Sequence, residues 1–193
     1  KGLKELQEIL HMDNLPEVIE CFDISNLQGK DSVASMVQFR NGLPKNSSYR
    51  KYKIRGHDSP NDPAMIHEVI SRRIQYLTNE DEELPDLIVI DGGKGQLRRG
   101  IEAAANFDIP TKIISIAKRL EEIFFDPSEK PIQLPETSPA LRIIQNIRDE
   151  AHRFAITYHK NLRDKKTKKS ILDEISDIGN KTKNILFEYF KSI

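Results

Sequence analysis

The spacing of apolar residues along this chain predicts its strands and helices. Residues 3–10 carry apolar side chains at helical spacing, and Asn14-Leu15-Pro16 ends that helix. Runs rich in β-branched and aromatic residues follow, and Asn41-Gly42 between the second and third run is a strong hairpin signal. These runs predict three antiparallel strands, at residues 18–24, 32–40 and 48–54.

The pattern then changes to helices that alternate with short aliphatic strands. Asn61-Asp62-Pro63 is a helix cap followed by a proline in the first turn, and Ser138-Pro139 repeats this signal. The predicted helices cover residues 64–77, 95–105 and 138–160. The predicted strands cover residues 87–90 and 112–116, with a short hairpin at 123–127 and 131–134. Antiparallel strands followed by β-α-β-α units indicate an α/β fold, with a mixed five-stranded sheet flanked by helices.

The end of the chain has a pattern of its own. Residues 171–193 predict two short helices with a turn at residues 177–180. These residues are too few to bury a core alone, so the unit is expected to dock on the main domain or to lack a partner half. We therefore expect a linker helix at 1–16, a main domain at 17–160, and a basic linker with a helical hairpin at 161–193.

The composition is that of a globular protein of about one domain. The 193 residues are 37% hydrophobic and 31% charged, and no apolar run approaches the roughly 18 residues of a membrane span. The single cysteine, Cys21, excludes an internal disulfide and fits a reducing compartment. Lys1 and Gly2 begin no secretory signal, and we expect the chain to be cut from a longer one. We predict a cytoplasmic protein with no membrane partner.

Charge is unevenly distributed along the chain, although the formal net charge is zero. Between residues 141 and 170, nine lysines and arginines stand against three acidic residues. Acidic residues concentrate instead at 80–83 and 121–129. A local basic run in a neutral chain suggests that a polyanion is held at one place, although a solvated helix end gives the same pattern.

Three polar residues stand where they are chemically useful. Asp23 lies inside a β-like run, E-C-F-D-I-S, and Asp91 ends an aliphatic run within I-V-I-D-G-G-K-G-Q. Because desolvating an unpaired carboxylate is costly, two carboxylates in such places suggest oxygen ligands for a hard divalent cation. His152 borders the apolar stripe of the long helix, one turn after Arg148. That position suits a third ligand or a proton shuttle beside a phosphate-binding guanidinium.

Each of these residues also has an ordinary structural explanation. An aspartate at a strand end is usually a cap or turn residue, and a histidine beside a core stripe is usually structural. After Asp91, Gly92-Gly93 permits close approach of backbone or substrate, and Lys94 opens a helix where it could reach a phosphate. This segment is not a Walker loop, because the spacing G-x-x-x-x-G-K-[ST] is absent. The residues alone rank a metal-dependent nuclease first among several possibilities.

Longer segments, in order along nearly the whole chain, resemble UvrC, the incising subunit of the bacterial nucleotide excision repair nuclease. They are E-C-F-D-I-S, V-A-S-M-V-Q-F, Y-R-K-Y-K-I, I-V-I-D-G-G-K-G-Q-L and L-P-E-T-S-P-A-L-R-I-I-Q-N-I-R-D-E-A-H-R-F-A. The resemblance is to the C-terminal half of that family, an RNase H-like endonuclease followed by two helix-hairpin-helix units. A GIY-YIG nuclease domain and a UvrB-interacting segment would precede Lys1.

The resemblance implies roles for named residues. Asp23, Asp91 and His152 match the family's catalytic triad, and Asp62 matches a further acidic position tied to the same incision, on the 5′ side of a lesion. The implied cofactor is Mg²⁺ or Mn²⁺, held by Asp23, Asp91 and His152. The implied partners are damaged double-stranded DNA and UvrB, with UvrA acting earlier, in DNA repair and the SOS response.

Phosphate contacts are expected from basic residues near the site and along the C-terminal run. Together with Gly179 of the predicted hairpin, the expected DNA-binding positions are Lys94, Arg148, Lys165, Lys166, Lys168 and Lys169. Contacts of this kind position a strand without reading its sequence, which suits an enzyme that must cut anywhere.

The chain departs from the family pattern in two places. The family commonly has histidine after D-I-S, where this chain has Asn26, so substrate contact beside the site is expected to differ while catalysis survives. The hairpin usually reads G-h-G, and Asp177 replaces the first glycine while Gly179 remains. The chain ends at Ile193 after one helix-hairpin-helix, so the DNA-binding tail is expected to be truncated.

Two other classes of protein compete with this interpretation. One is a non-catalytic RNase H-like scaffold that binds nucleic acid or UvrB, and the presence of Asp23, Asp91 and His152 together argues against it. The other is a stand-alone RNase H or junction resolvase, against which the unit at 171–193 and the family motifs argue. We predict a metal-dependent endodeoxyribonuclease in which water attacks the phosphodiester in line.

Overall fold

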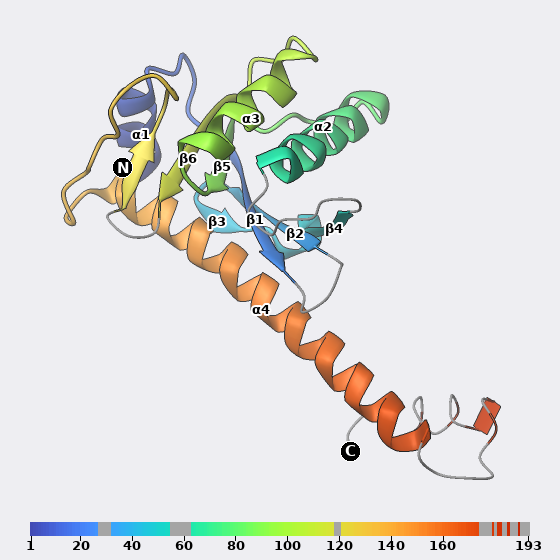
Figure 1. The fold of residues 1–193 in the computed structure, drawn as a ribbon. Coiled ribbons are helices and arrows are strands. Elements are labelled where there is room, and N and C mark those ends of the chain that lie inside the picture. Colours follow the sequence, from blue (N-terminus) through green and yellow to red (C-terminus); the bar gives the residue numbers. More distant parts are fainter. Residues whose placement is uncertain are drawn as a thin grey trace. The chain divides into compact units, whose positions relative to one another are not determined.

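The computed structural model describes residues 1–26, 32–54, 63–117 and 121–173, together with residues 179, 181, 182, 185 and 189. The chain divides into two compact units, Lys1–Ala155 and Ile156–Ile193. In chain order the elements are α1 (Gly2–Leu10), β1 (Val18–Asn26), β2 (Ser32–Arg40), β3 (Leu43–Pro44), η1 (Asn46–Ser48), β4 (Arg50–Ile54), α2 (Pro63–Asn79), β5 (Leu87–Asp91), α3 (Lys94–Ala105), β6 (Lys112–Ala117), β7 (Glu122–Phe124) and α4 (Pro139–Asp173) (Figure 1). Among the described residues, no helix combines the length and apolar character needed to cross a membrane.

A mixed sheet, with seven strands among the described residues, is the centre of the first unit. Its order is β3-β2-β1-β5-β6-β7, and β4 also pairs with β2. The central strand β1 is antiparallel to β2 and parallel to β5, which is parallel to β6. The predicted mixed α/β sheet is therefore confirmed: β1, β2, β4, β5 and β6 are its five expected strands. Short β3 and β7 extend it, and the Ile123–Ile132 bridge forms the expected second hairpin.

The hairpin signal at Asn41-Gly42 is also confirmed. Both residues have positive φ, 52° and 78°, which is the backbone of the type I′ turn that matches the twist of paired strands. The turn joins Arg40 to Leu43 across the hairpin. The strand expected at 48–54 begins later, at Arg50, because η1 interrupts the chain between β3 and β4. Both β3 and β4 then pair with β2.

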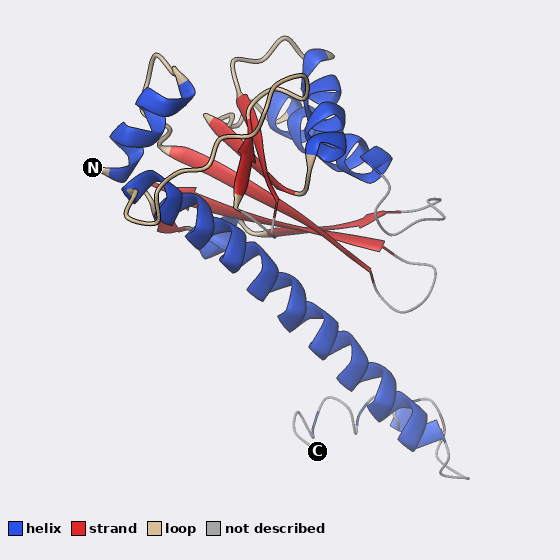
Figure 2. Cartoon of the chain, turned by 60° about the vertical axis from the view of Figure 1, so that its left-hand side comes forward, coloured by secondary structure: helices blue, strands red, loops and turns tan. Residues whose placement is uncertain are grey.

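Helices cover both faces of the sheet (Figure 2). Residues of α1 and of the first part of α4 build one apolar core against the sheet, and residues of α2 and α3 build the other. Side chains of β1 alternate between them, with Cys21 in the core under α4 and Phe22 in the core under α2. By the same alternation Asp23 lies on the α4 side of the sheet.

The N-terminal helix, expected as a linker, packs into the first unit. Leu6 and Leu10 of α1 are buried in the core under α4. The Glu5 carboxylate accepts hydrogen bonds from the Ser138 hydroxyl at 2.7 Å and from the Ala140 amide at 3.3 Å. Glu5 therefore places a negative charge at the start of α4, where the helix dipole favours it.

The long helix α4 starts where the sequence predicted and ends later. The Ser138 hydroxyl accepts a hydrogen bond from the Leu141 amide at 3.1 Å, which is the expected N-terminal cap. The helix was expected to end near residue 160 but continues to Asp173, so the basic residues 161–169 have a helical backbone. Most of the predicted helix-hairpin-helix at 171–193 lies outside the described residues, and that unit stays a prediction.

One polar cluster is buried in the core under α2. Glu20 of β1 is fully buried, and its carboxylate accepts hydrogen bonds from the Arg73 guanidinium, the shortest at 2.6 Å. Gln38, the cross-strand partner of Glu20, donates a further hydrogen bond to it at 2.9 Å. Every charge in this cluster therefore has an opposite charge within hydrogen-bond distance. The sequence analysis did not single out this cluster.

Candidate metal centre

The parallel pairing of β1 and β5 brings the two predicted carboxylates together. Phe22 pairs with Ile90, so Asp23 and Asp91 follow directly on neighbouring strands. Asp91 ends the strand after four buried aliphatic residues, at the edge where open α/β sheets place their ligands. Asp23 is 4% exposed, and Asp91 is half-buried.

Helix α4 supplies the third predicted residue. The His152 Nδ1 atom lies 3.6 Å from Oδ2 of Asp23. One ligand atom from each of Asp23, Asp91 and His152 lies within 4.8 Å of the other two. The His152 side chain is 51% exposed whereas that of Asp23 is 6% exposed, so the cluster has a buried floor and an open side. Two carboxylates and one imidazole at this spacing fit a divalent cation such as Mg²⁺ or Mn²⁺.

The turn after Asp91 is built for close packing. A Cβ atom at Gly92 would lie 2.9 Å from the Gln96 side chain, which folds back over the turn. The Gln96 side-chain oxygen accepts a hydrogen bond from the Gly93 amide at 3.1 Å. This contact lies at the start of α3, directly after the carboxylate, and a larger residue at Gly92 would displace the Gln96 side chain that makes it.

Electrostatics next to the carboxylates favour a cation and disfavour a thiolate ligand. Burial raises the pKa of the Cys21 thiol well above its usual value, and the negative charges of Asp91 and Asp23 raise it further. Cys21 therefore remains a neutral thiol in the core. The donor set of the cluster is oxygen and nitrogen, the set that hard cations prefer.

One flank of α4 is anchored beside the cluster through Arg148. Its guanidinium donates to Glu121 at 2.9 Å and to Asp149 at 2.8 Å. Burial lowers the pKa of Arg148, but these hydrogen bonds outweigh that effect and raise the pKa above its usual value. Gln145, one turn earlier, also donates to Glu121. The residue predicted to bind phosphate is thus engaged by two carboxylates, and Glu121 ties α4 to the start of β7.

The opposite flank of α4 is anchored to the segment around β4. The Tyr49 hydroxyl donates to Glu150 at 2.9 Å, and Arg153 donates to both oxygens of Glu150 at 2.6 Å. Hydrogen bonding from Arg153 lowers the pKa of Glu150, and that from Tyr49 adds to this. The Tyr49 and Phe154 rings pack edge to face with centroids 5.1 Å apart. These contacts, together with those of Arg148, fix the segment of α4 that carries His152.

The remaining predicted site residues are placed as follows. Lys94 is exposed at the start of α3, with its Nζ atom 5.7 Å from the centroid of the Phe124 ring. Asp62 lies outside the described residues. The four lysines of the basic run lie on the backbone of α4, and their side chains are outside the description. Gly179 is exposed.

Sequence reasoning missed the residues that hold α4. Glu121 was counted only as part of an acidic stretch, and Tyr49 and Glu150 were not singled out. Their partners lie about 27 to 101 positions away along the chain. No local spacing signals a contact of that range, so only the fold reveals it.

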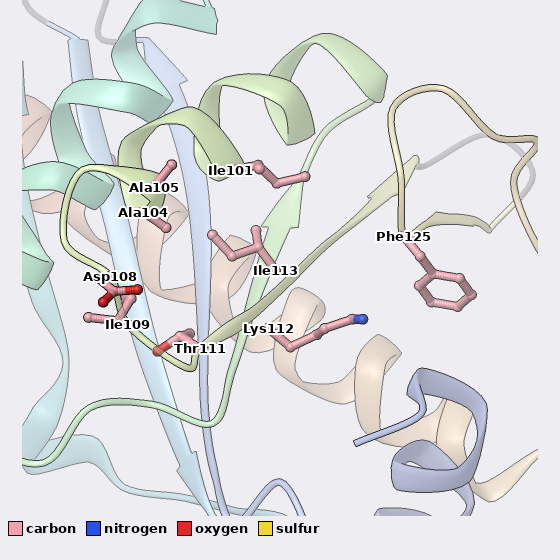
Figure 3. A pocket seen from close by; sticks show the side chains of 9 residues that line it. All are labelled: Ile101, Ala104, Ala105, Asp108, Ile109, Thr111, Lys112, Ile113 and Phe125. Carbon is pink, nitrogen blue, oxygen red and sulfur yellow. The ribbon is translucent and has the colours of Figure 1, made fainter. Parts of the chain in front are cut away.

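A hollow of about 350 Å³ lies elsewhere, between the end of α3 and the start of β6 (Figure 3). Asp91 pairs with Ile116 near the end of β6, whereas this hollow borders Lys112 and Ile113 at its beginning. The hollow and the carboxylates therefore lie at opposite ends of the strand. Its lining residues are Ile101, Ala104, Ala105, Asp108, Ile109, Thr111, Lys112, Ile113 and Phe125.

Residues 7–156 match the UvrC RNase H endonuclease domain. The chain is 49% identical to the UvrABC system protein C of Leptospira biflexa over 192 residues, which cover 99% of this chain and 31% of that protein. It is 48% identical to the UvrABC system protein C of Chlorobium chlorochromatii over 192 residues, which cover 100% of this chain and 30% of that protein. The chain thus spans about a third of the length of these curated relatives.

Among solved structures, the match to endonuclease V from Bacillus subtilis covers 75% of this chain and 82% of the endonuclease chain, at 14% identity and a TM-score of 0.40. Endonuclease V from Ciona intestinalis, in complex with DNA containing inosine, overlaps 55% of this chain and 48% of its own, at 20% identity and a TM-score of 0.40.

Proposed function

This chain belongs to the UvrC RNase H endonuclease domain family, and on that premise we propose that it hydrolyses a phosphodiester bond of damaged DNA in nucleotide excision repair. The observation that carries the proposal is the cluster of Asp23, Asp91 and His152, whose ligand atoms lie within 4.8 Å of one another. Relatives that share nearly half of the residues over the whole chain are named as components of the UvrABC system.

Asp23, Asp91 and His152 would hold one or two Mg²⁺ or Mn²⁺ ions. When bound, such an ion lowers the pKa of a water molecule and stabilises the negative charge that develops on the phosphate. Asp23 supports this use because its buried carboxylate lies beside a second carboxylate. Two negative charges this close repel each other, and a cation from solution relieves that repulsion.

His152 has two roles open to it. Its ring is half exposed and lies at the open side of the cluster, so it can act as a ligand or hand a proton to the leaving oxygen. Either role requires the ring to stay at its present distance from Asp23. The anchors on both flanks of α4, through Glu121 and through Tyr49, serve that requirement.

Basic side chains would position the DNA strand through its phosphates, and such contacts carry no sequence information. Lys94 at the start of α3 and the lysines at 165, 166, 168 and 169 would contact phosphates. Arg148 would do so after exchanging Glu121 or Asp149 for a phosphate oxygen. Asp62 is proposed as a further acidic residue needed for the same incision, and Gly179 as a DNA contact of the predicted hairpin.

We place this activity in the incision on the 5′ side of a lesion, with UvrB as the protein partner and UvrA acting earlier. This finer assignment rests on family membership and on the proposed site. It applies to proteins of the relatives' full length, of which this chain covers about a third. A non-catalytic scaffold is the competing function, and it needs neither the carboxylates nor a metal.

A nicking assay tests the proposal. The chain is incubated with bubble-containing duplex DNA and Mg²⁺ or Mn²⁺, as wild type and as Asp91→Asn. We expect metal-dependent nicking by wild type that EDTA abolishes and that Asp91→Asn lacks. Asp108→Asn is the matched control, because this exposed carboxylate lies at the opposite end of β6. Equal nicking by wild type and Asp91→Asn, or full nicking in EDTA, would contradict the proposed site.

A further inference from the structure

The edge strand β4 carries basic side chains that the proposed site does not use. Tyr52 and Ile54 pack into the core under α2, so Lys51 and Lys53 point to the other face of the sheet, the one that α4 covers. Both lysines are exposed. Arg153 of α4 lies near this strand, because it binds Glu150, which also accepts a hydrogen bond from Tyr49 just before β4. The Arg153 side chain is 62% exposed. We call Lys51, Lys53 and Arg153 the β4 edge surface.

The strand register places this surface in line with the candidate metal centre. Asp23 of β1 pairs with Ser35 of β2, and Ser35 pairs with Lys51 of β4. Neighbouring strands lie about 4.8 Å apart, so the backbone at Lys51 is about 10 Å from that at Asp23. The three residues form one row across the sheet on its α4 face.

Helix α4 separates the two ends of that row. Arg148 turns toward Glu121 on the flank that bears His152, whereas Phe154 turns toward Tyr49 on the opposite flank. Buried Ala151 faces the sheet between them. The β4 edge surface and the metal centre therefore lie on opposite sides of α4, about one helix width apart.

The Lys51 ammonium is held in a defined place. Its Nζ atom lies 4.3 Å from the centroid of the Phe154 ring, and the ring is itself fixed by its edge contact with Tyr49. A cation placed on an aromatic face loses less freedom when it binds an anion. Partial burial lowers the pKa of Lys51, so an anionic partner would stabilise its charged form.

Among the described residues, the β4 edge surface carries three basic side chains, those of Lys51, Lys53 and Arg153. The Glu150 carboxylate beside it is bound through both oxygens by Arg153 and accepts a third hydrogen bond from Tyr49. Its charge is thus compensated within the surface. Lys51 and Lys53 add two positive charges along an edge of the sheet.

We propose that the β4 edge surface binds the phosphate backbone of DNA as a second contact, across α4 from the metal centre. The proposal rests on the proposed function in one respect, that DNA is the polyanion. Lysines recognise phosphate as point charges without reading bases, and two lysines spaced along one strand suit consecutive phosphates. The alternative is that they only prevent pairing of this edge with another sheet edge, as lysines on edge strands commonly do.

The test is a titration of duplex DNA with the 193-residue chain at several salt concentrations without added metal, so that no cleavage is needed. We expect Lys51→Gln/Lys53→Gln to reduce the slope of log K against log salt by about 1.8, at roughly 0.9 per phosphate contact. Lys51→Arg/Lys53→Arg, which keeps both charges, should keep the wild-type slope. Arg50→Gln is the matched control, because Arg50 lies on the same strand with its side chain on the opposite face.

Each outcome decides the question. An unchanged slope in the Gln variant, an equal change in Arg50→Gln, or absence of wild-type binding at low salt would overturn the proposal. Self-association of the Gln variant in sedimentation without a change in slope would assign the lysines to edge protection and overturn it as well. If the Gln variant shows the expected reduction in slope while Asp91→Asn still nicks DNA, the surface is correct and the proposed metal centre is wrong.

Should the Gln variant fail to fold, as judged by circular dichroism, the single variants Lys51→Gln and Lys53→Gln replace it. Each single variant should reduce the slope by about 0.9. No change in the slope of either folded single variant would overturn the proposal.

Discussion

Two buried carboxylates on the same strand, three residues apart, have opposite surroundings. Glu20 lies under α2, where Arg73 and Gln38 donate hydrogen bonds to its oxygens at 2.6 to 3.2 Å. Asp23 lies under α4 beside Asp91, a second negative charge, and among the described residues it pairs with the His152 ring, at 3.6 Å. The first carboxylate is neutralised within the protein, and the second is placed where a cation from solution can neutralise it. Burial of a charge is therefore not by itself a sign of function; what distinguishes the two is the source of the opposite charge.

The largest expected effect comes from removing the Asp23 carboxylate. Asp23→Asn removes one of two carboxylates that would hold the metal, and we expect DNA nicking to fall by at least about 10³-fold, equivalent to about 4 kcal/mol. The free energy of unfolding in metal-free buffer should stay the same or rise, because repulsion from Asp91 is relieved. Nicking assays and denaturant melts of the same preparation measure both quantities. Wild-type nicking by Asp23→Asn would show that Asp23 is only a buried structural residue.

His152→Ala sharpens the comparison by removing the side chain on the exposed side of the cluster. We expect the nicking rate at saturating DNA to fall by about 10²–10⁴-fold, the usual contribution of one positioned acid or base. DNA affinity in the absence of metal should change little, because the half-exposed ring makes no phosphate contact in this account. A His152→Ala variant that binds DNA more weakly but cuts normally once saturated would contradict this role.

The sequence predicted the cluster well because its signals were local. An aspartate inside a β-like run and one at the end of an aliphatic run stand out without any fold. The parallel pairing of β1 with β5, which brings the two together, was not predicted and comes from the structure. His152 stood out because it borders the apolar stripe of the long helix, and the family resemblance then matched the same residue to the catalytic triad. The Glu20–Arg73 pair could not be found in this way, since its partners lie 53 positions apart and each resembles an ordinary surface residue of its element.

Features of the helices and strands were likewise predicted where the signal is local and missed where it depends on distant residues. The I′ turn at Asn41-Gly42 and the cap at Ser138 depend on neighbouring residues and were correct. The end of α4 was placed too early, because the basic run after residue 160 was interpreted as a linker although nothing in it breaks a helix. The docking of α1 through Leu6 and Leu10 depends on distant partners, and its own apolar spacing predicts only that it has a face to bury.

Arg73→Met breaks the structural side of the comparison. It leaves the Glu20 carboxylate buried without its guanidinium, and we expect the free energy of unfolding to fall by about 3–5 kcal/mol. Glu20→Gln in the same chain should recover much of that loss, because no buried charge then remains. Urea denaturation of the single and double variants measures both values. An equal loss in the double variant would mean that Arg73 acts through packing and not through charge.

A smaller effect is expected from the basic part of α4. Changing the lysines at 165, 166, 168 and 169 to glutamine should reduce the salt slope of DNA binding by about 3, from three or four phosphate contacts at roughly 0.9 each. The nicking rate at saturating DNA should be nearly unchanged, since these residues would position the strand and not cut it. If titrations at several salt concentrations give the wild-type slope, the basic run is a solvated helix and other surfaces bind the DNA.

Calorimetric titration of the chain with Mn²⁺ tests whether Asp23 and its neighbours take their opposite charge from a bound metal ion. We predict that wild type and Asp108→Asn bind Mn²⁺, that Mg²⁺ competes for the same site, and that Asp23→Asn and Asp91→Asn bind at least about 10-fold more weakly. The melting temperature of wild type, but not of Asp23→Asn, should rise with Mn²⁺ concentration, because a ligand that binds only the folded state stabilises it. Equal Mn²⁺ affinity in wild type and Asp23→Asn would contradict the account.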